Sequence, residues 1–249
     1  MIEEKAFKDA IGLCIGLERQ WLYLQRVLRQ DLDRDSSLQL LQGILMLMES
    51  LERSDTKVKL LQELMSAQDR AEVTENAGGI DTATKSTVQA KCEEIAKKLA
   101  KGPRILSRPL TAEPFLAKFF YKEASIYDAP FSDTWRSQKP EEIKLQVQYW
   151  LHHLEPVWQA VEMILWLVRS SASFTDIHIE SGFFRDGNCP ELLKLALVRV
   201  QYDEAYIYPV VTIAHRWLVI TLYEGKWVDG SYKLSQSNVS LNASIAICR

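Results

Sequence analysis

The sequence predicts an α+β protein in which an N-terminal all-α helical domain, residues 1–174, is followed by a C-terminal antiparallel β-sheet domain, residues 175–249. Two observations support this prediction. Apolar residues recur with a period near 3.6 in the first part and with a period of 2 after Thr175. The change of period opens on the segment Ser181-Gly-Phe-Phe-Arg-Asp-Gly, and neither half contains a recognisable catalytic constellation.

The composition is that of an ordinary soluble globular protein, with 249 residues, 47% of them apolar and 25% charged. The formal net charge of -3 provides no bulk attraction to nucleic acid or to anionic lipid, so we expect neither as a partner. The start, Met1-Ile-Glu-Glu-Lys, has the wrong charge for a secretory signal, and no apolar run approaches the ~20 residues that span a bilayer. We therefore expect a cytoplasmic protein.

Cysteine and histidine, the residues most often used in metal sites and in nucleophilic catalysis, do not form a pattern. The cysteines are scattered singly, which predicts reduced thiols rather than a zinc or redox site: Cys14, Cys92, Cys189 and Cys248. His152 and His153 have no H-E-x-x-H partner, and the alternation around His178 is typical of an exposed strand face. No G-x-S-x-G, P-loop or G-x-G-x-x-G occurs. We expect no enzyme activity and no cofactor.

The helical part begins with apolar residues at steps of three and four, which places them on one face of a helix: Cys14, Leu17, Trp21, Leu24 and Leu28. A second helix, residues 38–51, has no charge before Glu49, so we expect it to be buried nearly all round. Asp35 and the serines after it supply N-cap chemistry for this helix. The triplet Asp31, Asp33 and Asp35 lacks the glycine and glutamate of an EF-hand loop, so capping is the better interpretation.

A third and a fourth helix are predicted to form a partly projecting hairpin arm. Ser54 and Asp55 cap the third helix, whose apolar residues are Val58, Leu61, Leu64 and Met65. The fourth begins near residue 81 and shows only a thin stripe: Val88, Cys92, Ile95 and Leu99.

The end of this fourth helix is basic, from Lys97 to Arg104, with Arg108 just beyond. Cations are expected at a helix C-terminus because they complement the macrodipole, which explains the lysines. A site for an anion or a partner that uses Arg104 and Arg108 is the alternative.

The rest of the helical part is predicted as three helices around an irregular segment, residues 127–139. The helix before it carries Phe115, Leu116, Phe119 and Phe120. Pro140 is well placed as the first residue of the next helix, which buries Ile143, Val147, Trp150, Leu151 and Leu154. Pro156 starts the last one, with inward residues Val157, Val161, Ile164, Leu165 and Val168.

In the β part, residues 193–200 and residues 239–247 alternate in polarity and predict two half-buried strands. Residues 210–223 between them are rich in β-forming side chains. A turn is expected at Glu224-Gly225 and a hairpin at Asp229-Gly230. We expect an antiparallel sheet of about five strands, with a helix or a second subunit covering one face.

Several further segments, spread over nearly the whole chain, are informative together. They are Leu51-Glu-Arg-Ser-Asp-Thr-Lys-Val-Lys-Leu-Leu-Gln-Glu-Leu64, Pro103-Arg-Ile105, the segment at Ser181 followed by Glu191-Leu-Leu-Lys-Leu195, Tyr208-Pro209, His215-Arg216-Trp217 and Ile245-Ala-Ile-Cys248. In their order and spacing these segments resemble the ZapD family of bacterial cell-division proteins.

The resemblance implies a cytoplasmic homodimer at the division site that binds the C-terminal tail of the tubulin-like protein FtsZ. Two tail sites per dimer would cross-link protofilaments and stabilise the Z-ring. The family's basic pocket implies roles for Arg53 and Arg216, with Arg19 serving for an arginine of the first helix. Guanidinium groups suit this role because they engage carboxylates with fixed fork geometry.

This sequence also departs from the family pattern. Ile220 or Thr221 stands where a second arginine is expected, Asp133 stands in place of a histidine, and no arginine lies near Glu113. The alternative hypothesis is therefore a protein-interaction module of the same fold that binds a different partner. Under it, Arg53 complements a helix dipole and Arg216 is a strand-surface charge.

Overall fold

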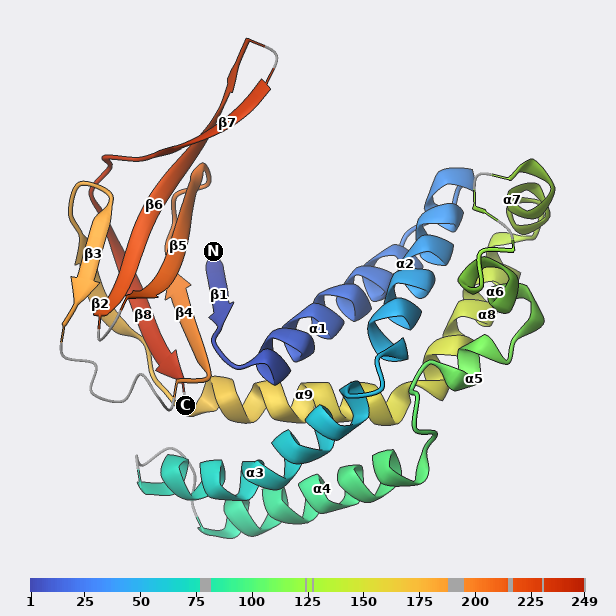
Figure 1. Cartoon of the computed structure of the whole chain (residues 1–249), viewed down its shortest axis with the longest axis horizontal. Coiled ribbons are helices and arrows are strands. Elements are labelled where there is room, and N and C mark those ends of the chain that lie inside the picture. The colour runs from blue at the N-terminus through green and yellow to red at the C-terminus, as the bar shows by residue number, and fades with distance from the viewer. Residues whose placement is uncertain are drawn as a thin grey trace.

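The structure is a computed structural model. It describes the chain apart from residues 77–81, 124, 127, 188–194, 215–216, 230 and 249. For residues 67–76, 82–85, 129, 214 and 228 it describes the backbone alone. Its helices are α1 (Asp9–Leu28), α2 (Arg34–Glu52), α3 (Thr56–Asn76), α4 (Thr82–Lys101), α5 (Arg108–Thr111), α6 (Pro114–Phe120), α7 (Ala129–Arg136), α8 (Pro140–His153) and α9 (Glu155–Ser170). Its strands are β1 (Ile2–Ala6), β2 (Thr175–Ile179), β3 (Phe183–Asp186), β4 (Leu197–Gln201), β5 (Ile207–Ala214), β6 (Trp217–Val228), β7 (Ser231–Gln236) and β8 (Leu241–Cys248). The predicted α+β class is confirmed, with the helices at one end and the sheets at the other (Figure 1).

The first two helices pack along each other, and every residue of the predicted stripe on α1 is buried. Capping of α2 is also confirmed, but the cap is Asp33 rather than Asp35. The Asp33 carboxylate accepts a hydrogen bond from the Ser36 amide at 2.7 Å, and hydrogen bonds from Ser36 lower the pKa of Asp33. The helix therefore starts four residues earlier than predicted, at Arg34.

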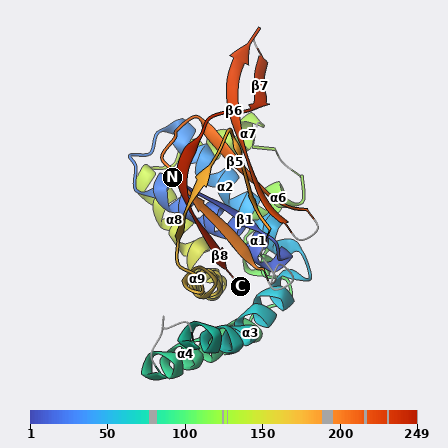
Figure 2. The same ribbon diagram turned by 90° about the vertical axis from the view of Figure 1, so that its left-hand side faces the viewer.

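The predicted arm is the α3–α4 hairpin, which packs against α9 and extends away from the rest of the helices (Figure 2). The thin stripe on α4 is buried as predicted. On α3 the predicted face is wrong in part, because Val58 is 51% and Met65 71% exposed. Leu64 is buried, in agreement with the predicted face, and its buried neighbour one helical turn earlier is Leu60, which was not predicted.

The segment predicted to be irregular contains α7. Its position is fixed by Trp135, which is completely buried and whose indole Nε1 donates a hydrogen bond to the carbonyl of Ser37 at 2.8 Å. The Trp135 ring also stacks on Phe115 and Trp150. These contacts come from distant parts of the chain, so local sequence did not reveal this helix. The predicted start of α8 agrees with the structure, α9 begins one residue before the predicted Pro156, and the residues predicted to be inward on both helices are buried.

The β part forms two packed antiparallel sheets rather than the single sheet of about five strands that the sequence predicted. The first sheet has the order β1-β4-β8-β2, and the second has the order β3-β6-β5 with β7 also pairing with β6. Strand β1 comes from the N-terminus, within the range assigned to the helical domain, and pairs with β4 from Ile2↔Gln201 to Ala6↔Leu197. The sequence analysis did not anticipate this strand.

The expected turn at Glu224-Gly225 is wrong, because β6 continues through it and pairs with β7. Gly225 leaves room for the Tyr232 ring, since a Cβ there would lie 1.8 Å from the Tyr232 hydroxyl oxygen. The predicted hairpin connects β6 to β7, with Val228 opposite Ser231 and Asp229 at a φ of 50°. Gly230 lies outside the described residues.

The first sheet lies between the helices and the second sheet. Leu197, Ala246 and Cys248 join the apolar core of the helices. Val198, Val200 and Ile245 join the core between the two sheets. Alternate residues of β4 and β8 thus serve two cores, and a helical layer covers one face of the sheet, as the sequence analysis expected.

An ion network connects β1 and β4 to the helices. The Arg169 guanidinium of α9 donates to both oxygens of Glu4 on β1, at 2.9 and 2.7 Å, and to both oxygens of Glu18 on α1, at 2.7 and 2.6 Å. Arg199 on β4 also donates to Glu4 at 3.0 Å. These side chains are 11–25% exposed, and the hydrogen bonds that Arg169 donates to Glu18 and Glu4 raise its pKa above the usual value. The network ties the N-terminal strand to the helical layer.

Candidate functional site

Arg53 lies where α2 ends, and its side chain is 66% exposed. Its Nε atom is 3.5 Å from a carboxylate oxygen of Asp55, and the other oxygen of Asp55 is 2.8 Å from Lys59 Nζ. The hydrogen bond from Lys59 is the main reason that the pKa of Asp55 is lowered. One carboxylate therefore holds two cations side by side at the α2–α3 junction.

These residues line a pocket of about 390 Å³, which we call the Arg53 pocket. Its other wall is the connection from β1 to α1 and the first turn of α1. Its charged and apolar lining includes Lys8, Asp9, Leu13, Arg53, Asp55 and Lys59. The pocket thus lies where the N-terminal strand of the first sheet passes into the helices.

The charges of the Arg53 pocket favour an anionic ligand only moderately. Lys8, Arg53 and Lys59 face two carboxylates, Asp9 and Asp55, so one positive charge is in excess. A guanidinium with a single long ion pair retains N–H donors for a further carboxylate. The arrangement suits an acidic peptide better than a buried small molecule, because the cations are near the surface.

Arg104 and Arg108 lie at the same corner of the molecule as Arg53 but do not line its pocket. Lys57 Nζ donates to the carbonyls of Ala100 and Gly102, at 2.9 and 2.6 Å. The Ser107 hydroxyl donates to Glu52. These bonds join the α2–α3 junction to the α4–α5 loop. Arg104 is exposed in that loop, and Arg108 is exposed at the start of α5.

Of the two remaining predicted arginines, the structure describes only Arg19, and that residue is not part of the pocket. Arg19 is exposed on α1 and does not line the pocket, while its neighbour Glu18 belongs to the ion network. Arg216 lies outside the described residues.

The structure shows what two of the residues that depart from the family pattern contact. Ile220 is completely buried between the two sheets, so its side chain serves the core. Asp133 is exposed on α7, and its carboxylate is 3.8 Å from Arg136.

Sequence reasoning missed Lys8 and Lys59 as members of the pocket. Asp55 directly precedes α3, and Lys59 lies four residues later in its first turn, a spacing that indicates an ion pair, so Lys59 was within reach of prediction. Lys8 offered no such signal, because its place depends on the unforeseen strand β1.

Nothing in the described part of the chain has the character of a catalytic centre. Burial raises the pKa of the Cys248 thiol to about 11 and also raises the pKa of Cys92, so neither is a thiolate at neutral pH. His178 Nδ1 is 2.8 Å from the Asn242 side-chain oxygen, on an exposed strand face. No cluster of metal-binding side chains occurs among the described residues, and Cys189 and His215 lie outside them. None of the helices in that part combines the length and apolar character that crossing a bilayer requires.

Comparison with known proteins gives a consistent result. The family model "ZapD", described as "Cell division protein", matches residues 17–220. The chain is 28% identical over 207 residues to "Cell division protein ZapD" of Pectobacterium carotovorum subsp. carotovorum (strain PC1), covering 78% of this chain and 80% of the relative. It is 28% identical over 192 residues to the protein of the same name from Cronobacter sakazakii (strain ATCC BAA-894), covering 72% and 77% of the two chains. Since the family match extends over most of its length, this chain belongs to the ZapD family of cell division proteins.

Proposed function

We propose that this protein binds the C-terminal tail of FtsZ in the cytoplasm, at the division site, and cross-links FtsZ protofilaments as a homodimer. Membership of the ZapD family supports a role in cell division. The observation that carries the proposal is the Arg53 pocket, where an exposed arginine stands beside Lys59 and Lys8 at the junction of sheet and helices.

The tail would bind through its carboxylates. Arg53 offers free N–H donors in a fixed fork, and an acidic residue of the tail would take a position next to Asp55. From the family resemblance we also propose Arg216 and Arg19 as contacts. Arg104 and Arg108, at the same corner as Arg53, are proposed to meet a neighbouring part of an extended peptide.

The hairpin of β6 and β7 supports the dimer. All six residues of β7 are exposed, and large apolar side chains of the hairpin are exposed to solvent: Trp227 is 75%, Leu234 61% and Tyr232 48% exposed. Trp227 and Tyr232 are cross-strand partners with ring centroids 5.6 Å apart. An exposed edge strand with large apolar side chains can associate with another chain, and we propose that a second copy of this protein covers it.

Sedimentation equilibrium tests the dimer. The wild type is expected at twice the chain mass of 28.6 kDa, and Trp227→Lys is expected to shift the protein toward monomer without loss of its melting transition. A wild type that is monomeric at micromolar concentration would contradict the proposal.

Co-sedimentation with FtsZ of the same organism tests tail binding. We expect the protein to pellet with FtsZ filaments and to stay in the supernatant when FtsZ lacks its tail. Arg53→Glu and Arg216→Glu should each reduce pelleting, while Lys97→Glu on α4 should not, because Lys97 is paired with Glu93 on an exposed helix face and does not line the pocket.

The second candidate function is a protein-interaction module of the same fold with another partner. The buried Ile220 and the Asp133–Arg136 pair favour it, since neither position adds a positive charge to a tail-binding surface. Pelleting that does not depend on the FtsZ tail, with a dimer intact, would select this function.

A further inference from the structure

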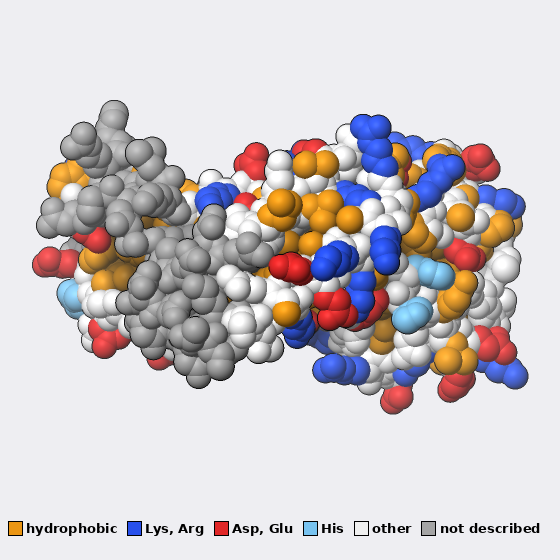
Figure 3. All heavy atoms as spheres, turned by 90° about the horizontal axis from the view of Figure 1, so that it is seen from below, with side chains coloured by type: hydrophobic (Ala, Val, Ile, Leu, Met, Phe, Trp, Pro, Cys, Tyr) orange, Lys and Arg blue, Asp and Glu red, His pale blue; other side chains and the backbone are white. Residues whose placement is uncertain are grey.

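A second surface, unrelated to the predicted arginines, has the features of a binding groove. Two cavities of about 740 and 670 Å³ adjoin on the helical layer and share Glu155 and Trp158. The first lies between α1 and the start of α9, and the second between α9 and α4. We call the two together the tryptophan groove. The view from below shows apolar side chains with basic ones beside them on this side of the molecule (Figure 3).

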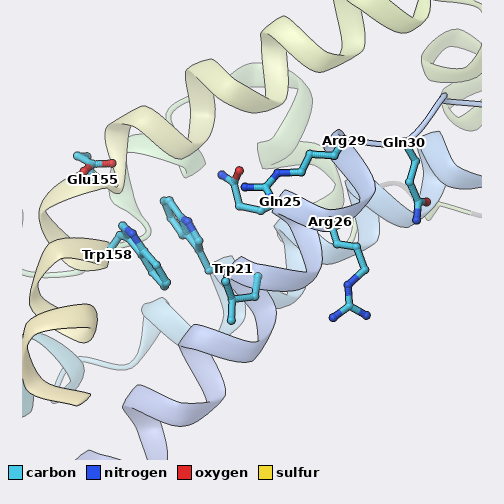
Figure 4. A pocket seen from close by; sticks show the side chains of 8 residues that line it. Trp21, Gln25, Arg26, Arg29, Gln30, Glu155 and Trp158 are labelled. Atoms are coloured by element: carbon cyan, nitrogen blue, oxygen red, sulfur yellow. The ribbon is translucent and has the colours of Figure 1, made fainter. Parts of the chain in front are cut away.

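Tryptophan side chains form the apolar part of the groove. Trp21 and Trp158 stack face to face, with ring centroids 5.0 Å apart and an interplanar angle of 6° (Figure 4). Trp166, further along α9, is 44% exposed, and Leu22 is 49% exposed. Tryptophan is the residue type most enriched at binding hot spots, because one side chain provides a large and rigid apolar area.

One end of the groove is basic. Arg26 and Arg29 are exposed there, and neither takes part in an ion pair with any described residue. Arg29 runs back along α1 toward Trp21, whereas Arg26 points away from the tryptophan pair (Figure 4). Lys144 is close by, because its Nζ donates to the Gln30 carbonyl at 2.8 Å. The macrodipole of α1 accounts for cations at this end but not for the aromatic wall next to them.

The groove is long enough for a short helix. From Glu155 to Trp166 the axis of α9 rises by about 16 Å, which equals roughly three helical turns. The middle is mixed in charge, since Glu155 and Glu162 line it on the α9 side, and Lys91 and the Glu94–Lys98 pair line it on the α4 side. Arg26 and Arg29 have no ion pair with a described residue at their end of the groove, and Lys144 lies next to them, outside the lining of the two cavities.

We propose that the tryptophan groove binds a short amphipathic helix of a partner protein, with apolar side chains on Trp158 and Trp166 and acidic residues against Arg29 and Lys144. Charge complementarity fixes the orientation of the helix, and the aromatic wall supplies the affinity. A second copy of this chain is the less suitable occupant, because the proposed dimer surface is the β6–β7 hairpin at the opposite side of the molecule (Figure 1). The groove is independent of FtsZ binding.

Selection from a peptide library tests this proposal and reveals which sequence pattern the groove recognises. Random 16-residue peptides displayed on phage are selected on the full-length wild-type protein. We expect enriched sequences to carry large apolar residues at helical spacing and at least two acidic residues toward one end. Failure to enrich any sequence, or enrichment of neutral or basic ones only, would overturn the proposal.

Binding of one enriched peptide is then measured by fluorescence anisotropy. Arg29→Glu should weaken it at least about tenfold, and Trp166→Ala about fivefold, whereas Lys97→Glu, which does not line the groove, should change it less than about twofold. Leu22→Ala replaces Trp166→Ala if the latter lowers the melting temperature. Equal binding to wild type and Arg29→Glu would contradict the proposed orientation. Sedimentation of the wild type as a species larger than a dimer, restored to a dimer by Trp166→Ala, would make the groove a self-association surface and overturn the proposal.

Discussion

The Arg53 pocket and the tryptophan groove are both basic surfaces of one molecule, and they are built in opposite ways. In the Arg53 pocket the cations are held by a carboxylate, since Asp55 contacts both Arg53 and Lys59. In the groove, Arg29 has no ion pair with a described residue, and a stacked pair of tryptophans lies next to it. The pocket offers charge with little apolar area, and the groove offers both.

The two surfaces therefore suit different kinds of binding. Exposed charges attract an acidic chain from a distance but give modest affinity that salt screens. Desolvated aromatic area gives affinity that salt hardly changes. We expect the pocket to depend on avidity from a dimer, which suits a cross-linker of filaments, and the groove to bind one partner segment on its own.

The largest expected effect is a loss of stability, and it should differ between the two surfaces because different parts of the fold form them. Glu4→Ala removes the carboxylate that accepts hydrogen bonds from Arg169 and Arg199, leaving two partly buried guanidinium groups with fewer partners. We expect the free energy of unfolding to fall by about 3 kcal/mol. The Arg53 pocket, which includes the β1–α1 connection, should be affected more than the groove, which lies wholly on helices.

Chemical denaturation measures this effect. Glu3→Ala on the same strand is the matched control, because Glu3 is not part of the ion network, and should change stability by less than about 0.5 kcal/mol. Similar losses for Glu3→Ala and Glu4→Ala would mean that the network does not hold β1 to the helices.

The next effect concerns the role of Arg53 itself. Charge reversal in Arg53→Glu should lower the affinity for an FtsZ tail peptide at least about tenfold, because a charge-assisted contact is lost and an acid faces an acidic peptide. Folding should be nearly unchanged, since the side chain is 66% exposed. Isothermal titration calorimetry on Arg53→Glu and Lys97→Glu makes the comparison, and equal affinities would remove Arg53 from the site.

Salt should then distinguish the two surfaces. Raising ionic strength from about 0.05 M to about 0.5 M shortens the screening length well below ~10 Å and should weaken tail binding several-fold more than binding of an amphipathic peptide to the groove, where aromatic contacts supply most of the affinity. Purified tail peptide is used rather than filaments, because salt also changes FtsZ assembly. An identical salt response at both surfaces would contradict the distinction between them.

The smallest expected effect is an increase in the affinity for the FtsZ tail. Asp55→Asn should increase tail affinity by about threefold, because it removes the carboxylate that competes for Arg53 and Lys59. Asparagine is as good an N-cap as aspartate, so α3 should keep its start. Hydrogen bonding from Lys59 lowers the pKa of Asp55, which therefore stays charged at neutral pH, so a substitution rather than a change of pH is needed to neutralise it. A loss of affinity, measured by the same calorimetry, would mean that Asp55 positions Arg53 instead of competing for it.

Sequence patterns predicted the helices well where burial follows a local period. Every residue predicted to be buried on α8 and α9 is buried, because both helices turn an apolar stripe toward the core, although α9 also buries Ala160, Met163 and Leu167. Helix α7 and strand β1 were missed for a shared reason. The first is fixed by the Trp135–Ser37 bond and the second by pairing with β4, and both are contacts between distant parts of the chain.

The candidate site was predictable only in part. Arg53 was proposed from the family resemblance, and the structure gives it a pocket together with Lys8 and Lys59. Arg19, Arg104 and Arg108 do not line that pocket. The tryptophan groove escaped prediction because Trp21 reads as one member of a buried helical stripe, and its stacking partner Trp158 is 137 positions away.

Site-specific photo-crosslinking can decide whether the FtsZ tail occupies the Arg53 pocket. Benzoylphenylalanine is placed at Leu13, which lines the pocket, and separately at Leu22, which lines the tryptophan groove. After irradiation with a labelled tail peptide, we expect a crosslink from position 13 that Arg53→Glu abolishes, and none from position 22. A crosslink from position 22 alone would place the tail in the groove and contradict the proposed function of the Arg53 pocket.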